Sequence, residues 1–288
     1  MSLAIPHGGP GFTFEADVFS GAAPPAAVGG VAFTTAASAN VDGTAVTVLS
    51  ALARDACYLV LSFAQTSGIG VPPQVMADIL IDPAGGTSWS SLIDDLLVGS
   101  AGNLNSSGGT GANLYFHFPL WIPAGASIGV QARRAHTTAL TGQIQAWVYG
   151  EPKRPDQWWC GQKVESLGIN AASSSGTGHV PAAVGAFSTW ATIGTSTKRY
   201  GALQFSVGGT DSNSLNGVTY WQMGVGGEQI PGTPTVLTAT TTAETMSRSG
   251  CHQPIWCDLP SGTAIQTRAQ GSSASPGESH DVAFYGVY

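Results

Sequence analysis

Hydrophobic and polar residues alternate in two well-separated segments of the chain. In the segment that begins at residue 127, Ile128, Val130 and Ala132 alternate with Gln131 and Arg133. The same alternation returns in the second half, where one set comprises Ile265, Thr267 and Ala269 and the other comprises Gln266, Arg268 and Gln270. Because successive side chains of a strand point to opposite faces, each segment is predicted to be a strand with one buried face and one wet face.

These two segments belong to an internal repeat. Residues 121–128 align with residues 258–265 at an offset of 137 (265 − 128), and both contain a Pro-x-Gly turn just before the strand. Each half then ends in a further predicted strand that closes on Tyr-Gly, at residues 144–150 and 282–286. Upstream, the hydrophobic pattern of residues 76–82 recurs at residues 220–226. The repeat therefore predicts one fold present in two copies.

The repeat length and the turn content predict an all-β protein of two tandem jelly-roll-like β-sandwich domains. The offset accommodates eight strands of ~5–6 residues with their loops, and the 39 Gly and 17 Pro residues disfavour helices. We expect a first domain at residues 1–150, a Pro-rich charged linker at 151–157 and a second domain at 158–288. A rival signal in the first domain comes from four apolar residues that are spaced as on a helix face and would add a helical turn without changing the fold: Trp89, Leu92, Ile93 and Leu96.

The composition predicts a surface with few charges. Charged residues make up 9% of the chain and hydrophobic residues 43%, with a net charge of −7, whereas about 25% charged residues is usual. The ten basic residues are scattered, so nucleic acid is not an expected partner. No signal-peptide pattern and no apolar run of about 20 residues occurs, which predicts no membrane insertion and release by lysis or within an assembly.

Cysteine and histidine spacing predicts neither a metal site nor a cofactor. The six histidines fall in separate regions, and Cys251 and Cys257 lack the second ligand pair that a zinc site needs. Cys57 lies in an apolar run and is expected to be a buried thiol. A disulfide, within or between subunits, is a candidate among Cys160, Cys251 and Cys257.

One string in the sequence matches a hydrolase pattern. Residues 125–129 read G-x-S-x-G around Ser127, but a nucleophile elbow needs a strand before the serine and a helix after it. Here a proline turn precedes Ser127, an alternating strand follows it, and the second repeat carries Ala264 at this position. No catalytic residue is therefore expected in this segment.

A second enzymatic interpretation is glycoside hydrolysis, which needs two carboxylates across a cleft. The candidates are Asp78 with Asp82, and Asp94 with Asp95. In the simpler interpretation Asp82 starts a turn and the two neighbouring aspartates lie on a solvated edge. We accordingly expect a non-enzymatic protein.

An aromatic and basic cluster after the linker is the candidate contact site. Trp158 and Trp159 follow closely on Arg154, and aromatic and arginine residues dominate interface hot spots. These side chains would seat in a neighbouring subunit or stack on a sugar ring. In the alternative interpretation the two tryptophans fill the junction between the domains.

The motifs of the repeat resemble those of tailed-phage virion proteins built from repeated β-sandwich modules. In that group a strand with a Gly-rich turn precedes a Pro-x-Gly turn, an Arg/Gln-rich strand and a terminal Tyr-Gly strand. The matching residues are 223–228, 259–270 and 282–286 in the second half, and 120–134 and 146–150 in the first. The first half departs from the pattern after Asp82, where Pro83 and an insertion replace the Gly-Glu turn.

This resemblance implies a structural role in the virion, assembled in the host cytoplasm. The expected place is the outer surface of the particle, as a neck or collar, tail or fibre, or capsid decoration protein. The implied partners are copies of the same chain and other virion proteins, with no catalytic site and no cofactor. The alternative is a receptor- or glycan-binding module of a tail fibre or adhesin, whose partner would be a host surface glycan.

Overall fold

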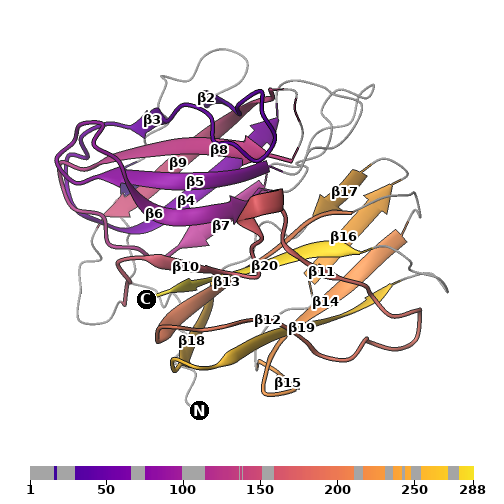
Figure 1. Cartoon of the computed structure of the whole chain (residues 1–288). Helices are drawn as coiled ribbons and strands as arrows, with labels where there is room; N and C mark the ends of the chain where they lie inside the picture. Colours follow the sequence, from indigo (N-terminus) through magenta and orange to yellow (C-terminus); the bar gives the residue numbers. More distant parts are fainter. Residues whose placement is uncertain are drawn as a thin grey trace.

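The described residues fold into strands, with one short 3-10 helix among them at Ala171–Ser173 (Figure 1). The computed structural model describes residues 16–17, 30–65, 75–98, 114–135, 137, 139–150, 159–210, 217–230, 236–241, 244–247, 254–271 and 279–288. The predicted all-β class is confirmed. Within these ranges, no helix is long and apolar enough to cross a membrane.

The first nine strands form two facing antiparallel sheets. Sheet 1 has the order β1-β9-β4-β7, with β2 also paired to β9, and sheet 2 has the order β3-β8-β5-β6. The strands are β1 (Ala16–Asp17), β2 (Val31–Thr34), β3 (Val46–Leu49), β4 (Ala56–Gln65), β5 (Val75–Asp82), β6 (Ser90–Leu97), β7 (Leu114–Phe118), β8 (Ser127–Arg134) and β9 (Thr141–Gly150).

The later strands repeat this arrangement. Sheet 3 has the order β10-β20-β13-β18, with β11 also paired to β20, and sheet 4 has the order β12-β19-β14-β16-β17, with β15 paired to β14. The strands are β10 (Val164–Leu167), β11 (Thr177–His179), β12 (Ala191–Thr195), β13 (Tyr200–Thr210), β14 (Gly217–Val225), β15 (Glu228–Gln229), β16 (Val236–Thr241), β17 (Glu244–Ser247), β18 (Ile255–Leu259), β19 (Ala264–Gly271) and β20 (His280–Val287).

Both halves are jelly rolls with the same strand order. In sheet 1, β9 lies between β1 and β4, just as β20 lies between β10 and β13 in sheet 3. In sheet 2, β8 lies between β3 and β5, just as β19 lies between β12 and β14 in sheet 4. The registers also correspond, since Ile81 pairs with Ile128 in the first half and Val225 pairs with Ile265 in the second. The two tandem jelly rolls predicted from the repeat are therefore confirmed. The domain limits stay a prediction, and the linker at 151–157 lies outside the described residues.

Two local predictions fail in the first jelly roll. The segment expected to contain a helical turn is strand β6, whose pairing with β5 is interrupted by register shifts. These irregularities bring two adjacent pairs, Leu92 with Ile93 and Leu96 with Leu97, into the core and so imitate a helical spacing.

The polar face of β8 is also not wet. Trp89 covers it at Gly129, where an added Cβ would lie 2.9 Å from the indole ring, and Arg133 is buried. In the second copy the prediction holds, because buried and half-buried residues alternate along β19.

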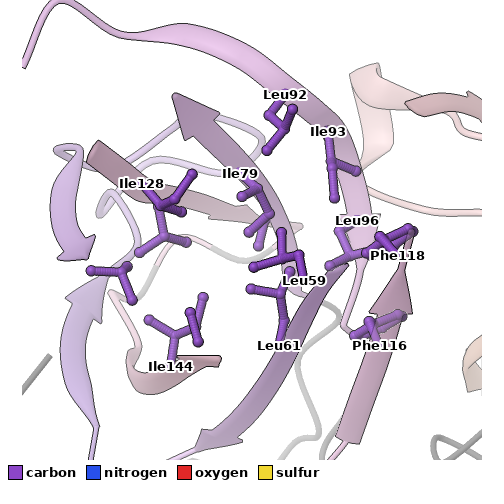
Figure 2. Packing of buried hydrophobic residues seen from close by; sticks show 14 of the residues in the cluster. Leu59, Leu61, Ile79, Leu92, Ile93, Leu96, Phe116, Phe118, Ile128 and Ile144 are labelled. Atoms are coloured by element: carbon purple, nitrogen blue, oxygen red, sulfur yellow. The ribbon is translucent and has the colours of Figure 1, made fainter. Parts of the chain in front are cut away.

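The interior of the first jelly roll is aliphatic and aromatic. Side chains from both sheets meet between the layers, and Figure 2 shows Leu59, Ile79, Leu96 and Phe118 pointing into this space from four different strands. Phe116 and Phe118 lie on the edge strand β7 and are still buried. An edge strand can bury such rings only if something covers the open side of the sandwich.

Sheet 3 of the second jelly roll provides that cover. Figure 1 shows β10, β13 and β20 running between the first jelly roll and the layer that contains β12, β14 and β19. On β20, Ala283, Tyr285 and Val287 join the core of the first jelly roll, whereas Val282 and Phe284 join the core of the second. Sheet 3 is therefore buried on both faces, and it belongs to the cores of both jelly rolls.

Tyr285 lies at the centre of this shared region. Its ring meets Phe116 and Phe118 edge-on, with ring centroids 6.4 and 6.3 Å away. The phenol oxygen accepts a hydrogen bond from the backbone N–H of Leu97 at 2.5 Å and donates one to the carbonyl oxygen of Asp95 at 3.2 Å. The second jelly roll thus satisfies backbone groups of edge strand β6 in the first.

We predict that Tyr285→Ala destabilises both jelly rolls together. The loss of a large buried aromatic ring costs about 3–5 kcal/mol, and the shared core should make the chain unfold in one cooperative transition. Urea unfolding followed by intrinsic tryptophan fluorescence and by circular dichroism measures both effects. Tyr285→Phe is the matched control, with a loss of about 1–3 kcal/mol from the unsatisfied Leu97 N–H. Two separate transitions in the unmodified protein would contradict the shared core.

Candidate functional site

The structure places one of the three predicted contact residues. Trp159 is 42% exposed, and its ring meets Trp256 of β18 edge-on at 6.4 Å. It also covers Gly201 of β13, where an added Cβ would lie 2.6 Å from the indole. Trp256 itself packs against the shared core. Trp158 and Arg154 lie outside the described residues, so a role of this cluster in ligand or subunit contacts stays a prediction.

The cysteine predictions are met in part. Cys57 is buried, and its thiol donates a hydrogen bond to the carbonyl oxygen of Gly150 at 3.1 Å. Burial, with a smaller contribution from the Asp258 carboxylate, raises the pKa of Cys257 to about 12, which disfavours the reactive thiolate. Cys251 lies outside the described residues. The candidate disulfide among Cys160, Cys251 and Cys257 stays a prediction.

Ser127 has a structural environment. It is the first residue of β8, it is 1% exposed, and its Oγ accepts a hydrogen bond from the backbone N–H of Ala51 at 3.2 Å. The turn before it contains Gly125 with φ 81°, which places a left-handed residue where the Pro-x-Gly pattern predicts one. This turn-to-strand geometry differs from the strand-to-helix elbow of a nucleophilic serine.

Asp82 makes the turn that the sequence predicts. Its two carboxylate oxygens accept hydrogen bonds from the backbone N–H groups of Ala84 at 2.9 Å and Ser88 at 2.8 Å. These bonds lower the pKa of Asp82, since they stabilise the charged form. Both oxygens are engaged in holding the hairpin between β5 and β6.

The prediction that Asp94 and Asp95 share a solvated edge is wrong for Asp95. Asp94 is exposed and accepts a hydrogen bond from the hydroxyl of Ser91. Asp95 has φ 57°, a left-handed conformation, and turns its carboxylate onto the guanidinium of Arg133. This backbone irregularity in β6 therefore separates two neighbouring acids into different environments.

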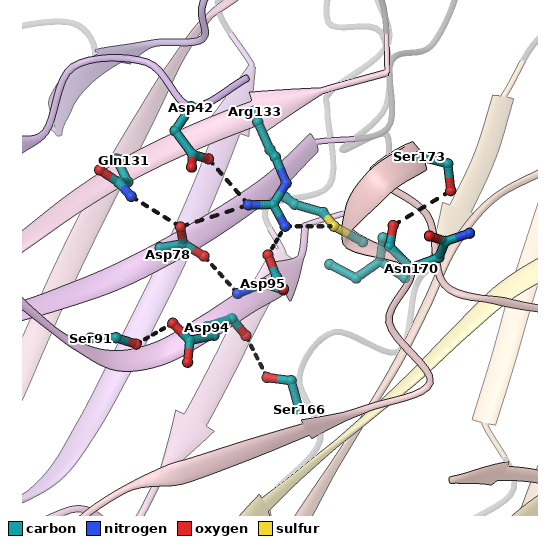
Figure 3. Close-up of polar contacts among 12 residues, drawn as sticks. Asp42, Asp78, Ser91, Asp94, Asp95, Gln131, Arg133, Ser166, Asn170 and Ser173 are labelled. Atoms are coloured by element: carbon teal, nitrogen blue, oxygen red, sulfur yellow. Dashed lines mark hydrogen bonds and ion pairs between the residues drawn. The ribbon is translucent and has the colours of Figure 1, made fainter. Parts of the chain in front are cut away.

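Arg133 forms the centre of a buried ionic cluster (Figure 3). Its Nη1 lies 3.2 Å from a carboxylate oxygen of Asp42 and 3.9 Å from one of Asp78, and its Nη2 pairs with Asp95. Asp78 also accepts hydrogen bonds from the Asp95 backbone N–H at 2.7 Å and from the Gln131 side chain at 3.1 Å. Burial raises the pKa of Asp78 in spite of these partners.

This cluster connects strands rather than lining a reaction centre. It joins β5, β6 and β8 to the segment before β3, and both oxygens of Asp78 already accept hydrogen bonds. Within the ranges that the structure describes, no group of three or more histidine, cysteine or acidic residues has a metal-binding arrangement. The cluster could not be predicted from the sequence, because Asp42 and Asp95 come from irregular backbone.

Two histidines are buried in the core of the second jelly roll. His179 of β11 pairs with His280 of β20, and both rings lie against Trp221, with centroids 5.6 and 5.3 Å away. Burial, helped by the neighbouring His179, lowers the pKa of His280 to about 4, and burial also lowers the pKa of His179. His179 has a hydrogen-bonding partner in the Ser188 hydroxyl at 2.9 Å.

The outer face of sheet 4 carries a stacked arginine. The Cζ of Arg268 lies 4.5 Å from the ring centroid of Trp190 and 5.0 Å from that of Phe187. Its Nε donates a hydrogen bond to the side-chain oxygen of Gln222 at 2.8 Å. Tyr220, on the same face of β14, is 39% exposed. This face therefore brings aromatic, amide and cationic groups together.

The comparisons with known proteins leave the family open. No family model and no curated protein matches this chain. The structure of PNGF-II aligns with 96% of this chain at 10% identity and a TM-score of 0.33, and this chain spans 65% of its length. N-glycanase F (PNGase F) aligns with 88% of this chain and 94% of its own, at 8% identity and a TM-score of 0.34.

A third solved structure is a tandem of binding modules. The CBM22-1-CBM22-2 tandem domain from Paenibacillus barcinonensis Xyn10C aligns with 96% of this chain and 94% of its own, at 10% identity and a TM-score of 0.26. Likenesses at such scores carry no information on activity or ligands.

We predict that Arg133→Met lowers the free energy of unfolding by about 3 kcal/mol, because it leaves the buried carboxylates of Asp78 and Asp95 without their cation. Arg199→Met is the matched control. Arg199 pairs with Asp258 at 2.6 Å, but the two side chains are 73% and 58% exposed, so its loss should cost much less than the loss of Arg133. Equal losses for the two variants in urea unfolding would refute the structural role of the cluster.

Acid should destabilise the second jelly roll through its buried histidines. Below pH 6.5 the unfolded chain binds protons at His179 and His280, whereas in the folded chain both pKa values are lowered, that of His280 to about 4. The free energy of unfolding should therefore fall between these pH values, by about 3 kcal/mol for His280.

Urea titrations at pH 7, 6, 5 and 4 measure this dependence. Replacing the titrating groups in His179→Gln/His280→Gln should flatten the curve over this interval, even if the variant is less stable at pH 7. An unchanged slope in the double variant would assign the acid sensitivity to other groups.

Proposed function

We propose that this chain is a non-enzymatic structural protein on the outer surface of a tailed-phage particle. The observation that carries the proposal is the burial of sheet 3 on both faces, which makes one sheet part of the cores of both jelly rolls. A block of this kind resists bending between its halves, because relative motion would expose Tyr285, Phe116 and Phe118 to water. Such a block suits a shell or collar that must keep its shape.

The low surface charge supports contacts between neighbouring subunits. Only 9% of the residues are charged, so broad contacts between subunits would bury few charges and would carry a small desolvation cost. The motifs shared with phage virion proteins point to the same role. Copies of this chain and other virion proteins are the proposed partners.

Three of the candidate acids, Asp78, Asp82 and Asp95, favour a structural role over hydrolysis. Asp78 and Asp95 are held by Arg133, and Asp82 is held by the backbone of its own turn. A glycosidase needs a protonated acid facing a second carboxylate across a substrate cleft. The engagement of these carboxylates in strand contacts supports the proposal of a protein without catalysis.

The test is the presence and the copy number of the chain in particles purified from the lysate that contains it. We expect quantitative mass spectrometry to find many copies per particle, and antibody labelling of intact particles to reach the chain from outside. Sedimentation of the isolated chain should show oligomers. Absence from purified particles, with the chain left in the soluble fraction, would overturn the proposal.

A further inference from the structure

The outer face of sheet 4 is not covered by the first jelly roll. Sheet 3 lies between them (Figure 1). The alternation along β19 turns Gln266, Arg268 and Gln270 outward, opposite the buried Ile265, Thr267 and Ala269. On the neighbouring strand β14, Tyr220 pairs with Gln270 and Gln222 pairs with Arg268.

The plane of the Arg268 guanidinium is held by three contacts. Phe187 and Trp190 stack on it at 5.0 and 4.5 Å, and its Nε is bound to Gln222. Trp190 in turn rests on the sheet over Gly224, where an added Cβ would lie 2.5 Å from the ring. The two aromatic rings and Gln222 thus occupy the guanidinium plane and the Nε, which leaves the two Nη nitrogens for another partner.

The loop that carries these rings is itself fixed to the sheet. The backbone N–H groups of Ala182 and Ser188 both donate to the carbonyl oxygen of Ala269, at 3.0 and 2.9 Å. The hydroxyl of Ser188 accepts a hydrogen bond from the Ala269 N–H at 3.0 Å. The arginine is thus preorganised before any ligand arrives, which lowers the entropic cost of binding.

Arg268 also differs from Arg133 and Arg199 in its lack of a carboxylate partner among the described residues. Arg133 pairs with aspartates in the core, and Arg199 pairs with Asp258 through two nitrogens. Among the described residues, no acidic side chain pairs with Arg268. An oriented guanidinium with two available nitrogens matches a carboxylate, which binds such a fork with two parallel hydrogen bonds.

We infer that this face binds an acidic saccharide, a glycan whose sugar carries a carboxylate. The carboxylate would pair with the Nη nitrogens of Arg268. Tyr220 and Gln270 lie two residues further along the same strands, about 7 Å away, and offer the next sugar unit an aromatic face and an amide. Aromatic and amide groups beside a cation favour a sugar acid over an acidic peptide, which offers no ring face to Tyr220.

Titration calorimetry of the full chain tests this inference with three probes. The first is an oligosaccharide of alternating hexuronate and N-acetylhexosamine units, the second is its carboxyl-reduced counterpart, and the third is a poly-glutamate peptide. We expect the acidic saccharide to bind, and the reduced saccharide to bind at least about tenfold more weakly, as befits the loss of a charged hydrogen bond. The peptide should also bind at least about tenfold more weakly than the acidic saccharide.

Variants assign the binding to this face. Arg268→Lys keeps the charge but loses the fork, and we expect its affinity for the acidic saccharide to fall about tenfold. Tyr220→Ala should weaken binding of the saccharide and leave binding of the peptide unchanged. Arg199→Lys is the matched control. It alters an exposed arginine beside sheet 3, where Arg199 pairs with Asp258 of β18, and it should bind as the unmodified chain does.

Three outcomes would overturn the inference. They are no binding of the acidic saccharide, equal binding of its carboxyl-reduced form, and tighter binding of the peptide. Thermal melting of each variant verifies that a loss of affinity is not a loss of fold. Since particle content and sugar affinity are separate measurements, the failure of either inference leaves the other standing.

Discussion

Tyr285 and the strand that carries it exclude water from two cores at once. Strand β20 turns Ala283, Tyr285 and Val287 toward one jelly roll and Val282 and Phe284 toward the other. Strand β13 does the same, with Ser206 bonded to the carbonyl of Leu97 on one side and Phe205 in the second core on the other. The remaining architecture depends on this sheet, because the first jelly roll has an open side between β6 and β7 that sheet 3 closes.

Much of the architecture could be predicted from the sequence, because its strands are punctuated by turns that need particular residues. The Pro-x-Gly turns at Gly125 and Gly262 both adopt positive φ, and the strands after them fall in equivalent registers. The Tyr-Gly ends were recognisable for the same reason. Repetition of these local signals also fixed the expected number of sandwiches.

The failures have a common physical origin in contacts between segments far apart in the sequence. The irregular pairing of β6, with Asp95 at φ 57°, imitates a helical period that no local rule distinguishes from a strand. The polar face of β8 alternates as an exposed face should, yet Trp89 and Asp95 fold over it. The burial of sheet 3 on both faces could not be predicted either, since an apolar run in the sequence does not show which jelly roll its side chains will pack against.

The candidate site was missed for a related reason. Arg268 occupies the position of Gln131 in the repeat (268 − 137), and the sequence gives both residues the same outward direction. In the first copy this face carries the ionic cluster around Arg133. In the second copy it carries Arg268, which stacks on Trp190 and Phe187. The difference arises from the loop before β12, whose aromatic residues suggested core packing when considered alone.

The shared core also sets a problem for synthesis in the cell. Phe118 leaves the ribosome well before Tyr285, which follows it by 167 residues (285 − 118). At translation rates of about 5–20 residues per second, the open side of the first jelly roll waits roughly 10–30 seconds for its cover. During that interval the nascent chain presents two aromatic rings and an unpaired strand edge, and it needs a chaperone or rapid dilution to escape premature association.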